Sequence, residues 1–414
     1  MTTAVKTKTP KAPDISGDLR LIRSELNVEF FERREVIDAL MLCILSKSHG
    51  FLLGLPGTGK SALISNLCNR INGANFFDVL LDRQLGKEDL FGPTDIGLYE
   101  QTSRNGGKGI WQRDIEGYLP WCHIGFGDEV GKAGPAVTNQ LLWAMNERRF
   151  RNGKIVLDIP MISFFGASNE MLEMPEQAAL FDRYLVRVDV DYIEESGHFK
   201  SYLDTAVLLS KPTRTTVELG DLLNVIENVI PTITIPVGIL DNLVALRSKL
   251  RTEHEVRPSD RRWKAAMRLL QASAYLNGRT VVDEDDLTIL AHVLWEDPVK
   301  ASIVGQEVNS ITSEFNKAAV MIEREVAELL VNTRAQKGKA VNSRSEFGTQ
   351  TKHKIDTRDA ELRALIEKAN RQGRNTDKLE VVRDSLKTLK VAVFTICLGM
   401  SEAKAEHNAS KPSA

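Results

Sequence analysis

The chain has 414 residues, of which 42% are hydrophobic and 27% are charged, a composition typical of a globular protein with two or three domains. Its 54 lysines and arginines and 56 aspartates and glutamates give a net charge of -2, which argues against a protein that mainly coats nucleic acid. The sequence lacks a membrane-spanning apolar run, a secretory leader core and paired cysteines, so we expect a soluble, cytoplasmic protein without disulfides or zinc.

The N-terminal half alternates helical and strand-like patterns. Residues 1–17 are rich in Thr, Lys and Pro and predict a disordered tail, whereas residues 19–45 carry apolar positions at helical spacing and predict one or two helices. Five short apolar runs follow between residues 51 and 190: FLLGL, FFDVLL, WCHIGF, ISFFGAS and YLVRVDV. Because helical stretches separate them, we expect an α/β core with a largely parallel sheet at residues 18–205.

The C-terminal half reads as helical. We expect a helical lid subdomain at 206–300, one helix at 303–331, a mobile loop at 332–357 and amphipathic helices near 358–370 and 377–398. Residues 301–414 would then form a helical hairpin suited to interactions. From residue 332 onward there are 17 Lys and Arg and 10 Asp and Glu, an excess of 7 that leaves the rest of the chain at -9. This asymmetry favours an interaction role, although a solvated helical face explains it about as well.

Residues 54–61 read GLPGTGKS and match the phosphate-loop pattern G-x-x-x-x-G-K-[ST] in full, between an apolar strand and a helical run. Glycines let backbone N–H groups turn inward around phosphates, and the following helix N-terminus adds positive potential. We expect Lys60 to reach the β- and γ-phosphates and Ser61 to bind Mg²⁺. The full set of expected nucleotide-binding residues is Gly54, Pro56, Gly57, Thr58, Gly59, Lys60, Ser61 and Ala62.

Two further strand ends carry polar residues. The run IGFGDE at 124–129 ends in Asp128 and Glu129, and we expect Asp128 to hold Mg²⁺ and Glu129 to polarise the attacking water. The run ISFFGASN ends in Asn169, whose neutral amide can orient water beside the γ-phosphate. Either element alone is more often a turn, but both follow the phosphate loop in the order that a nucleotide hydrolase requires.

With these three elements in order, the chain resembles the AAA+ ATPases and, more narrowly, their MoxR family. The resemblance continues through FGP (91–93), GYLP (117–120), KAGP (132–135), NQLL (139–142), MNER (145–148), ASNE (167–170), LFDR (180–183) and SDRRW (259–263). The string DRRWKAAMRLLQASAYLNGR at 260–279 is similar to the RavA subgroup. The resemblance covers roughly residues 18–300 and does not extend closely into the region beyond.

The resemblance implies roles for several residues. Asn169 corresponds to sensor 1, and Arg183 resembles an arginine finger that reaches the γ-phosphate bound by a neighbouring subunit. Arg261 resembles sensor 2, a lid arginine acting in cis, with Arg262 as a competitor for that role and Arg148 as an alternative interface arginine. The expected cofactors are ATP and Mg²⁺.

Two local segments fit the same family. The residues RNGK at 151–154 give a strong hairpin signal and resemble the hairpin before sensor 1, and residues 95–113 resemble an insert that interrupts helix 2. Both suit contact with a substrate or partner, although simple connecting loops explain them too.

We therefore expect an ATP-hydrolysing remodelling factor that forms a ring, with six subunits favoured, and acts on a protein client. The resemblance implies a partner with a von Willebrand A domain. The alternatives are a motor stimulated by nucleic acid and a nucleotide-switched scaffold with low turnover. The near-neutral charge weakens the first, and the intact Glu129, Asn169 and Arg183 weaken the second.

Overall fold

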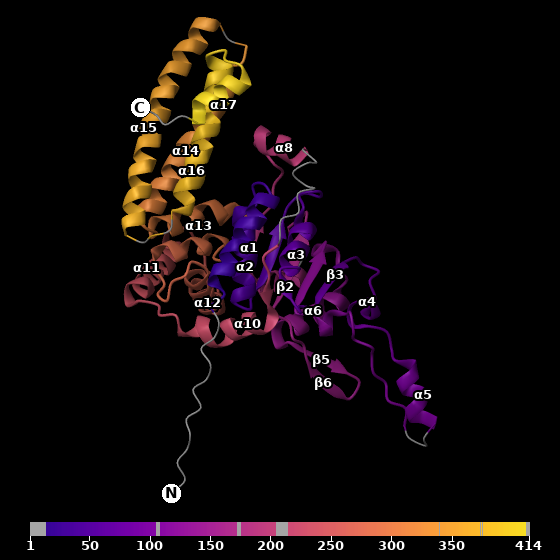
Figure 1. Cartoon of the computed structure of the whole chain (residues 1–414). Helices are drawn as coiled ribbons and strands as arrows, with labels where there is room; N and C mark the ends of the chain where they lie inside the picture. The colour runs from indigo at the N-terminus through magenta and orange to yellow at the C-terminus, as the bar shows by residue number, and fades with distance from the viewer. Residues whose placement is uncertain are drawn as a thin grey trace. The chain divides into compact units, whose positions relative to one another are not determined.

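A computed structural model describes residues 14–104, 108–171, 175–203, 214–338, 340–372, 374 and 376–410. The chain divides into two compact units, which we call the first unit (residues 1–243 and 251–301) and the second unit (residues 244–250 and 302–414). Figure 1 traces the chain through both. In the described ranges, no helix is long and apolar enough to cross a membrane.

The first unit alternates strands and helices. Its strands are β1 (His49–Leu53), β2 (Ile71–Asn72), β3 (Phe76–Leu80), β4 (Ile124–Asp128), β5 (Arg149–Asn152), β6 (Ile155–Asp158), β7 (Ser163–Ser168), β8 (Tyr184–Asp189) and β9 (Val217–Glu218). Its helices include α1 (Ser16–Glu29), α2 (Arg34–Leu45), α3 (Lys60–Cys68), α4 (Lys87–Phe91), α5 (Ile96–Arg104), α6 (Pro135–Glu147), α7 (Pro175–Arg183), α8 (Ser196–Leu203), α10 (Leu219–Asn224) and α12 (Asp260–Leu276). Shorter or irregular helices are η1 (Leu119–Trp121), η2 (Val130–Lys132), η3 (Val225–Val229), η4 (Ile230–Thr232) and η5 (Glu284–His292), and α11 (Val237–Glu253) contributes residues to both units.

All five apolar runs noted in the sequence form strands of one parallel sheet in the order β3-β4-β7-β1-β8. The α/β fold expected from the sequence is therefore confirmed. Strand β7 is buried along its whole length, as a central strand covered on both faces should be. In β4, a side chain at Gly125 would place its Cβ 2.5 Å from the Phe164 ring, so the glycine makes room for an aromatic residue of β7.

The predicted hairpin and insert are joined to each other. Strands β5 and β6 pair antiparallel around a turn at Gly153, which confirms the hairpin. The buried side chain of Asn152 accepts a hydrogen bond from the Arg113 N–H at 2.6 Å and donates to the Arg113 carbonyl at 3.0 Å. Since Arg113 also forms a bridge with Thr94, the base of the insert is closed and fastened to the hairpin. Residues 105–107, at the centre of the insert, lie outside the described residues.

The region expected to be the lid contains α10, α11, α12 and η5, and the one or two helices expected at residues 19–45 are two, α1 and α2. The expected boundary at 205/206 lies outside the described residues, and so does most of the expected tail. Residues 14–17 of that segment are described, and Ser16 and Gly17 form the start of α1, so the disorder expected there is wrong for these two residues.

The second unit corrects two predictions. The single helix expected at 303–331 is two helices, α13 (Pro298–Ser310) and α14 (Glu314–Arg334), because Ser313 caps α14 by accepting from the Asn316 N–H. The mobile loop expected at 332–357 is wrong, because α15 (Val341–Arg371) begins inside it. Helices α16 (Asp377–Ala392), η6 (Val393–Cys397) and α17 (Glu402–Ser410) complete this unit.

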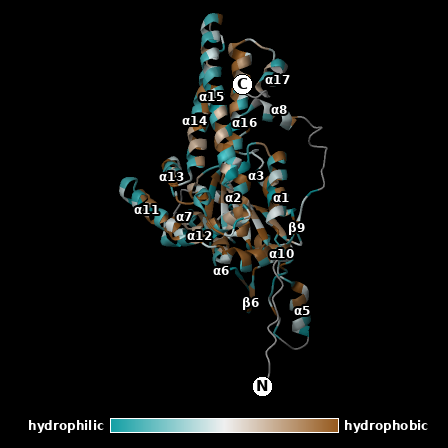
Figure 2. Cartoon of the chain, turned by 60° about the vertical axis from the view of Figure 1, so that its left-hand side comes forward, coloured by the Kyte–Doolittle hydropathy of each residue, from teal (hydrophilic) through white to brown (hydrophobic). Residues whose placement is uncertain are grey.

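The second unit is a helical bundle with a continuous core. Helices α14, α15 and α16 pack on one another, and Figure 2 shows that each carries both hydrophobic and hydrophilic residues along its length. Buried positions include Ile322 on α14, Leu362 on α15 and Leu386 on α16. Ion pairs at the helix interfaces, such as Lys390 with Asp356 at 3.0 Å, add polar contacts that restrict how the helices align.

Candidate active site

The two edges of the five-stranded sheet carry different chemistry. Because the strands are parallel, β1, β4 and β7 end on one edge, which we call the carboxyl edge, and begin on the other, the amino edge. The phosphate loop follows β1 at the carboxyl edge, where the Gly54 N–H donates to the Ser168 carbonyl of β7 at 3.0 Å. The phosphate loop, Asp128 and Asn169 are thus brought together by three adjacent strands, as the sequence predicted.

The phosphate loop has an open inner face. Gly57 and Gly59 adopt φ of +80° and +83°, and an added Cβ at either would meet nothing within 4 Å. Such left-handed conformations are strained for other residues, so glycine is required here. Gly54 has a different reason, since its added Cβ would lie 2.1 Å from the Val190 carbonyl oxygen. The loop leads directly into α3, which begins at Lys60.

Lys60 is the main cation of this loop. Its Nζ donates to the carbonyls of Gly54 at 2.6 Å and Leu55 at 3.0 Å, and lies 3.4 Å from the Thr58 hydroxyl. Burial lowers the pKa of Lys60, and the carboxylates of Asp128 and Glu129 act against that shift. The ammonium is thus within electrostatic reach of the acidic pair, and its present acceptors are groups that a phosphate oxygen can replace.

Two residues around the loop were not found from the sequence. The buried side chain of Arg33 donates to the carbonyls of Thr58 and Asp191, and so joins the region before α2 to the loop and to the end of β8. The Tyr192 hydroxyl donates to the Pro56 carbonyl at 3.1 Å. Neither residue belongs to a motif, because their partners are backbone carbonyls that any residue supplies.

The acidic pair has an unusual backbone. Glu129 adopts φ of +54°, a left-handed conformation uncommon for a glutamate, and its N–H donates to the Asp128 carboxylate at 3.0 Å. The Glu129 Oε2 is buried and accepts no hydrogen bond among the described residues, although Lys132 Nζ lies 3.4 Å away. A buried carboxylate oxygen with this free acceptor capacity suits a group that takes a proton from water.

Asn169 directly follows β7 and is half-buried, between the strands that carry the phosphate loop and the acidic pair. The Ser168 hydroxyl next to it accepts from the Glu170 N–H at 3.2 Å, which fixes the turn after the strand. This is the place at which an amide can contact both a phosphate and a water.

Arg183 lies at the amino edge. It ends α7 and immediately precedes Tyr184, the first residue of β8, which pairs with His49 at the start of β1. The phosphate loop follows the other end of β1, and a six-residue strand spans about 20 Å. Arg183 is therefore on the opposite side of the sheet from the phosphate loop of its own chain. Its Nη1 donates to Asp182 Oδ2 at 3.0 Å.

Arg262 is occupied by structural contacts. Only 2% of its side chain is exposed, and its guanidinium donates to the carbonyls of Leu185 and Val293, each at 3.1 Å, and to Asp182. Burial lowers the pKa of Arg262, while Asp182 opposes that shift. A guanidinium held in this way is not available to a nucleotide, so Arg262 does not compete for the sensor 2 role in this structure.

Arg261 contacts a side chain near the end of α6. Its Nη2 donates to Asn146 Oδ1 at 3.1 Å, near the end of α6, whose Met145 carbonyl contacts His49 at the start of β1. Arg261 therefore lies at the amino edge and makes no hydrogen bond to the phosphate loop among the described residues, and its sensor 2 role stays a prediction. The buried Arg262 next to it explains this placement, because it holds the start of α12 against the start of β8.

Arg148, the alternative interface arginine, is likewise committed to its own chain. Its guanidinium donates to the carbonyls of Lys47 and Ile162, which precede β1 and β7. Burial lowers the pKa of Arg148. These contacts fasten the end of α6 to the amino edge and leave Arg148 a structural role.

His49 completes the amino edge. Its Nδ1 accepts from the Phe164 N–H at 2.9 Å, so Nε2 carries the proton and donates to the Met145 carbonyl at 3.2 Å. Burial, reinforced by the positive charge of Arg148, lowers the pKa of His49 to about 3. The ring is therefore neutral at pH 7 and serves as a buried hydrogen-bonding link.

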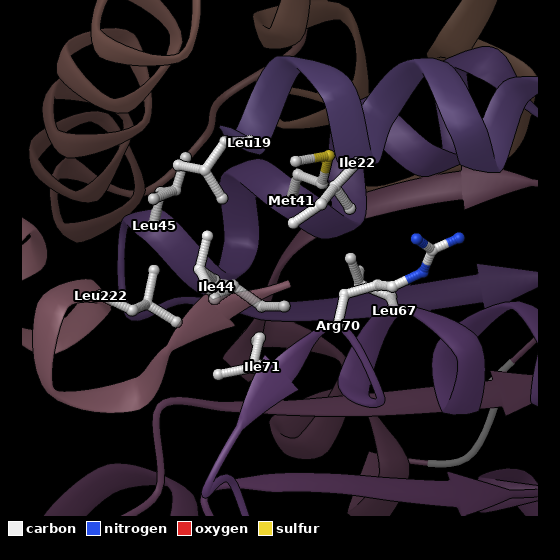
Figure 3. Close-up of a pocket in the computed structure, with 10 residues that line it drawn as sticks. Leu19, Ile22, Met41, Ile44, Leu45, Leu67, Arg70, Ile71 and Leu222 are labelled. Atoms are coloured by element: carbon white, nitrogen blue, oxygen red, sulfur yellow. The ribbon is translucent and has the colours of Figure 1, made fainter. Parts of the chain in front are cut away.

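A small apolar cavity lies away from the phosphate loop, between α1, α2 and the end of α3. Figure 3 shows its lining, in which the guanidinium of Arg70 points away from the apolar side chains of Ile22, Met41 and Ile44. That guanidinium pairs instead with Glu25 and Glu29. The cavity has a volume of about 20 Å³ and lacks polar partners, so it is a packing gap and not a nucleotide site.

Comparisons with known proteins agree with this geometry. The model of the MoxR domain in the MoxR-vWA-beta-propeller ternary systems matches residues 17–221, and an AAA lid domain model matches residues 238–308. The chain is 37% identical over 314 residues to the uncharacterized protein MJ0812 of Methanocaldococcus jannaschii, covering 76% of this chain and 81% of that protein. It is 25% identical over 162 residues to the chaperone MoxR1 of Mycobacterium tuberculosis, covering 38% and 40% of the two proteins.

A solved structure of a candidate ATPase from Cytophaga hutchinsonii superposes with a TM-score of 0.56 at 19% identity, covering 72% of this chain and 93% of that one, which shows a shared fold. The fold and the phosphate-loop site together define an AAA+ ATPase. The chain belongs to the MoxR family of these ATPases. Its expected place in the RavA subgroup stays a prediction.

Proposed function

We propose that this chain binds ATP with Mg²⁺ at the carboxyl edge and hydrolyses it to drive the remodelling of a protein client. The observation that carries the proposal is the meeting of Lys60, Glu129 and Asn169 at the ends of three adjacent strands. The residues fit a nucleotide, since the inner face of the loop is open at Gly57 and Gly59 and its backbone N–H groups lead into a helix N-terminus.

Each residue at this edge has a chemical task. Ser61 and Asp128 would hold Mg²⁺, which supplies charge neutralisation on the phosphates when bound. Lys60 exchanges its loop carbonyls for phosphate oxygens, and Asn169 orients the attacking water. Glu129 accepts the proton of that water at its buried Oε2.

The position of Arg183 supports an assembled enzyme. Since Arg183 lies at the amino edge, it is suited to complete a site on a neighbouring chain and not its own. A contact between unlike edges of adjacent subunits is heterologous, and repetition of such a contact closes into a ring when the rotation allows it. We propose a ring of six subunits in which Arg183 stabilises transition-state charge in trans. Arg261, at the same edge, is placed for the same neighbour.

The proposed client contact is the joined hairpin and insert. These two segments expose large apolar side chains, with Ile96 66%, Trp111 61% and Val156 52% accessible. Asn152 holds the two segments together, so they move as one element. The hairpin leads directly into β7, whose end carries Asn169, and this gives a short path along the main chain between Asn169 and the proposed client contact. The C-terminal helices are a second candidate contact.

A protein with a von Willebrand A domain is the proposed partner. The matched family model describes MoxR domains from systems that contain such a protein, and the relative MoxR1 carries the name chaperone. This proposal extends those descriptions to the present chain.

The test is Glu129→Gln in the full chain. The amide keeps the shape of the side chain but cannot take a proton, so we expect ATP affinity within about twofold of wild type and Mg²⁺-dependent phosphate release lowered about 100-fold. Retained release would show that Glu129 is not the base. The client and a von Willebrand A partner should co-purify with the same variant. Stimulation of wild-type turnover by DNA would instead favour the motor alternative.

A further inference from the structure

We propose that Asp182 is a positioning residue that couples Arg183 to the lid, so that the orientation of the finger depends on how helix α12 is seated. This inference rests on the proposed role of Arg183 in trans. Asp182 belongs to the LFDR segment at 180–183, but the sequence alone assigns no role to its carboxylate.

The carboxylate of Asp182 bridges two arginines with one oxygen each. Its Oδ2 accepts from Arg183 Nη1 at 3.0 Å, and its Oδ1 accepts from Arg262 Nη2 at 3.3 Å. Arg262 lies on α12, whereas Arg183 ends α7, so the bridge joins the finger to the lid helix. The Asp182 side chain is 41% exposed and Arg183 is 23% exposed, which leaves the finger side of the bridge at the surface.

The same segment is joined to the lid at two further points. Arg262 Nη1 donates to the carbonyl of Leu185 on one side and Val293 on the other, both at 3.1 Å. Arg187 links the Phe181 and Trp295 carbonyls in the same manner, and its guanidinium lies 3.8 Å from the centre of the Phe181 ring. Two buried guanidinium groups thus cross-link the residues around Arg183 to the residues that follow η5.

These cross-links are costly to break. Arg187 and the Arg262 side chain are almost wholly buried, and a buried cation that loses its acceptors keeps its desolvation penalty. The segment around Arg183 therefore follows α12 if the lid is displaced. Within that segment, Asp182 is the contact that reaches Arg183 itself.

The guanidinium of Arg183 presents five N–H donors, and Asp182 takes one of them. Its Nε is buried and makes no hydrogen bond to any described residue. Fixing one corner of the planar fork sets the direction of the remaining donors, which is what bidentate contact with a phosphate on the neighbouring subunit requires. Without Asp182, the fork loses its orientation and its tie to α12.

The experiment is a subunit-mixing assay with Asp182→Asn in the full chain. As a homogeneous assembly, this variant should bind ATP within about twofold of wild type but turn over about tenfold more slowly. Mixed with an excess of Glu129→Gln subunits, which have intact fingers and inactive sites, the Asp182→Asn subunits should recover turnover to the level of wild type in the same mixture. A folding defect would not be repaired by a neighbour, so recovery isolates the positioning role.

Three further proteins complete the test. Arg183→Ala should show the same recovery of turnover on mixing. Arg262→Lys keeps the charge but loses the planar fork, so it should lose less turnover than Asp182→Asn and recover it on mixing. It takes the place of Asp182→Asn if that variant does not fold. Asp384→Asn, which removes a 71% exposed carboxylate paired with Lys387 in the second unit, is the matched control and should match wild type.

Two results would overturn the proposal. The first is turnover at the wild-type level in Asp182→Asn. The second is a loss of turnover in Asp182→Asn that mixing does not restore, although mixing restores turnover in Arg183→Ala. If mixing does not restore turnover in Arg183→Ala either, Arg183 is not a finger that acts in trans, and the inference about Asp182, which depends on that role, fails as well.

Discussion

The carboxyl and amino edges of the same sheet use their charged residues in opposite ways. At the carboxyl edge, Lys60 donates to carbonyls of its own loop, and Glu129 keeps a buried oxygen that accepts no hydrogen bond from the described residues. At the amino edge, Arg148 and Arg262 donate to backbone carbonyls that fix one element against another. Charges at the first edge are available to a ligand, whereas most charges at the second hold the fold together.

Arg183 differs from Arg148 and Arg262 at the same edge. Among the described residues, its polar partner is the partly exposed carboxylate next to it, and no hydrogen bond to a described backbone carbonyl fixes it in the fold. This difference separates a candidate finger from its structural neighbours more clearly than sequence spacing does. It also supports the proposal that Arg183 completes a site on a neighbouring chain.

The largest expected effect comes from removing the side chain of Arg183. Arg183→Ala should lower turnover about 1,000-fold, because an arginine finger neutralises charge that develops only in the transition state. ATP affinity should stay within about twofold of wild type, since the phosphate loop is on the other edge. Steady-state phosphate release and equilibrium binding of a fluorescent ATP analogue measure the two quantities. A loss confined to ATP affinity would place Arg183 in its own binding site.

The structural arginines should behave differently. Arg262→Met removes a buried guanidinium together with its hydrogen bonds to four carbonyls and to the Asp182 carboxylate, so we expect the free energy of unfolding to fall by about 3 kcal/mol. Arg261→Met is the matched control, because the neighbouring side chain is exposed and makes one hydrogen bond, and its unfolding free energy should change by less than about 0.5 kcal/mol. Denaturant unfolding measures both. Equal losses of unfolding free energy in the two variants would contradict the structural role given to Arg262 alone.

The smallest expected effect concerns pH. The pKa of His49 is about 3 in the folded chain, against 6.5 for an ordinary histidine, so between these values the unfolded chain binds a proton that the folded chain does not. Stability should therefore rise with pH through this window and become flat above pH 6.5. His49 alone should make the protein about 2 kcal/mol less stable at pH 5 than at pH 7.

His49→Gln isolates this contribution. The amide can accept from the Phe164 N–H and donate to the Met145 carbonyl without titrating. The difference in unfolding free energy between wild type and variant should shrink by about 2 kcal/mol from pH 7 to pH 5. An unchanged difference would mean that the buried ring titrates normally.

The sheet and the phosphate-loop edge could be predicted because their signals are local. Glycine at positions 57 and 59 is required by backbone conformation, and apolar runs form strands because both faces of the sheet are covered. The roles of Arg261 and Arg262 could not be separated from the sequence. They are adjacent and chemically identical, and only packing shows that one is buried against β8 while the other faces solvent.

The first half of α15 was assigned to a loop because the fully buried positions nearest its start are not large apolar residues. Gly348 and Thr351 are buried there, and an added Cβ at Gly348 would lie 2.7 Å from the Cys397 Cβ. A glycine in a polar segment indicates a loop by its backbone freedom, but here its small size allows a close approach to η6. The break between α13 and α14 was missed for a related reason, because the apolar spacing continues across the cap at Ser313.

The claim that the two edges complete each other across subunits is tested most directly by mixing two inactive variants. Arg183→Ala subunits keep an intact carboxyl edge, and Glu129→Gln subunits keep an intact amino edge. If Arg183 acts in trans, mixing them restores phosphate release that neither shows alone, with a maximum at intermediate ratios. If Arg183 acts within its own chain, every mixture remains as inactive as its components, and the account is contradicted.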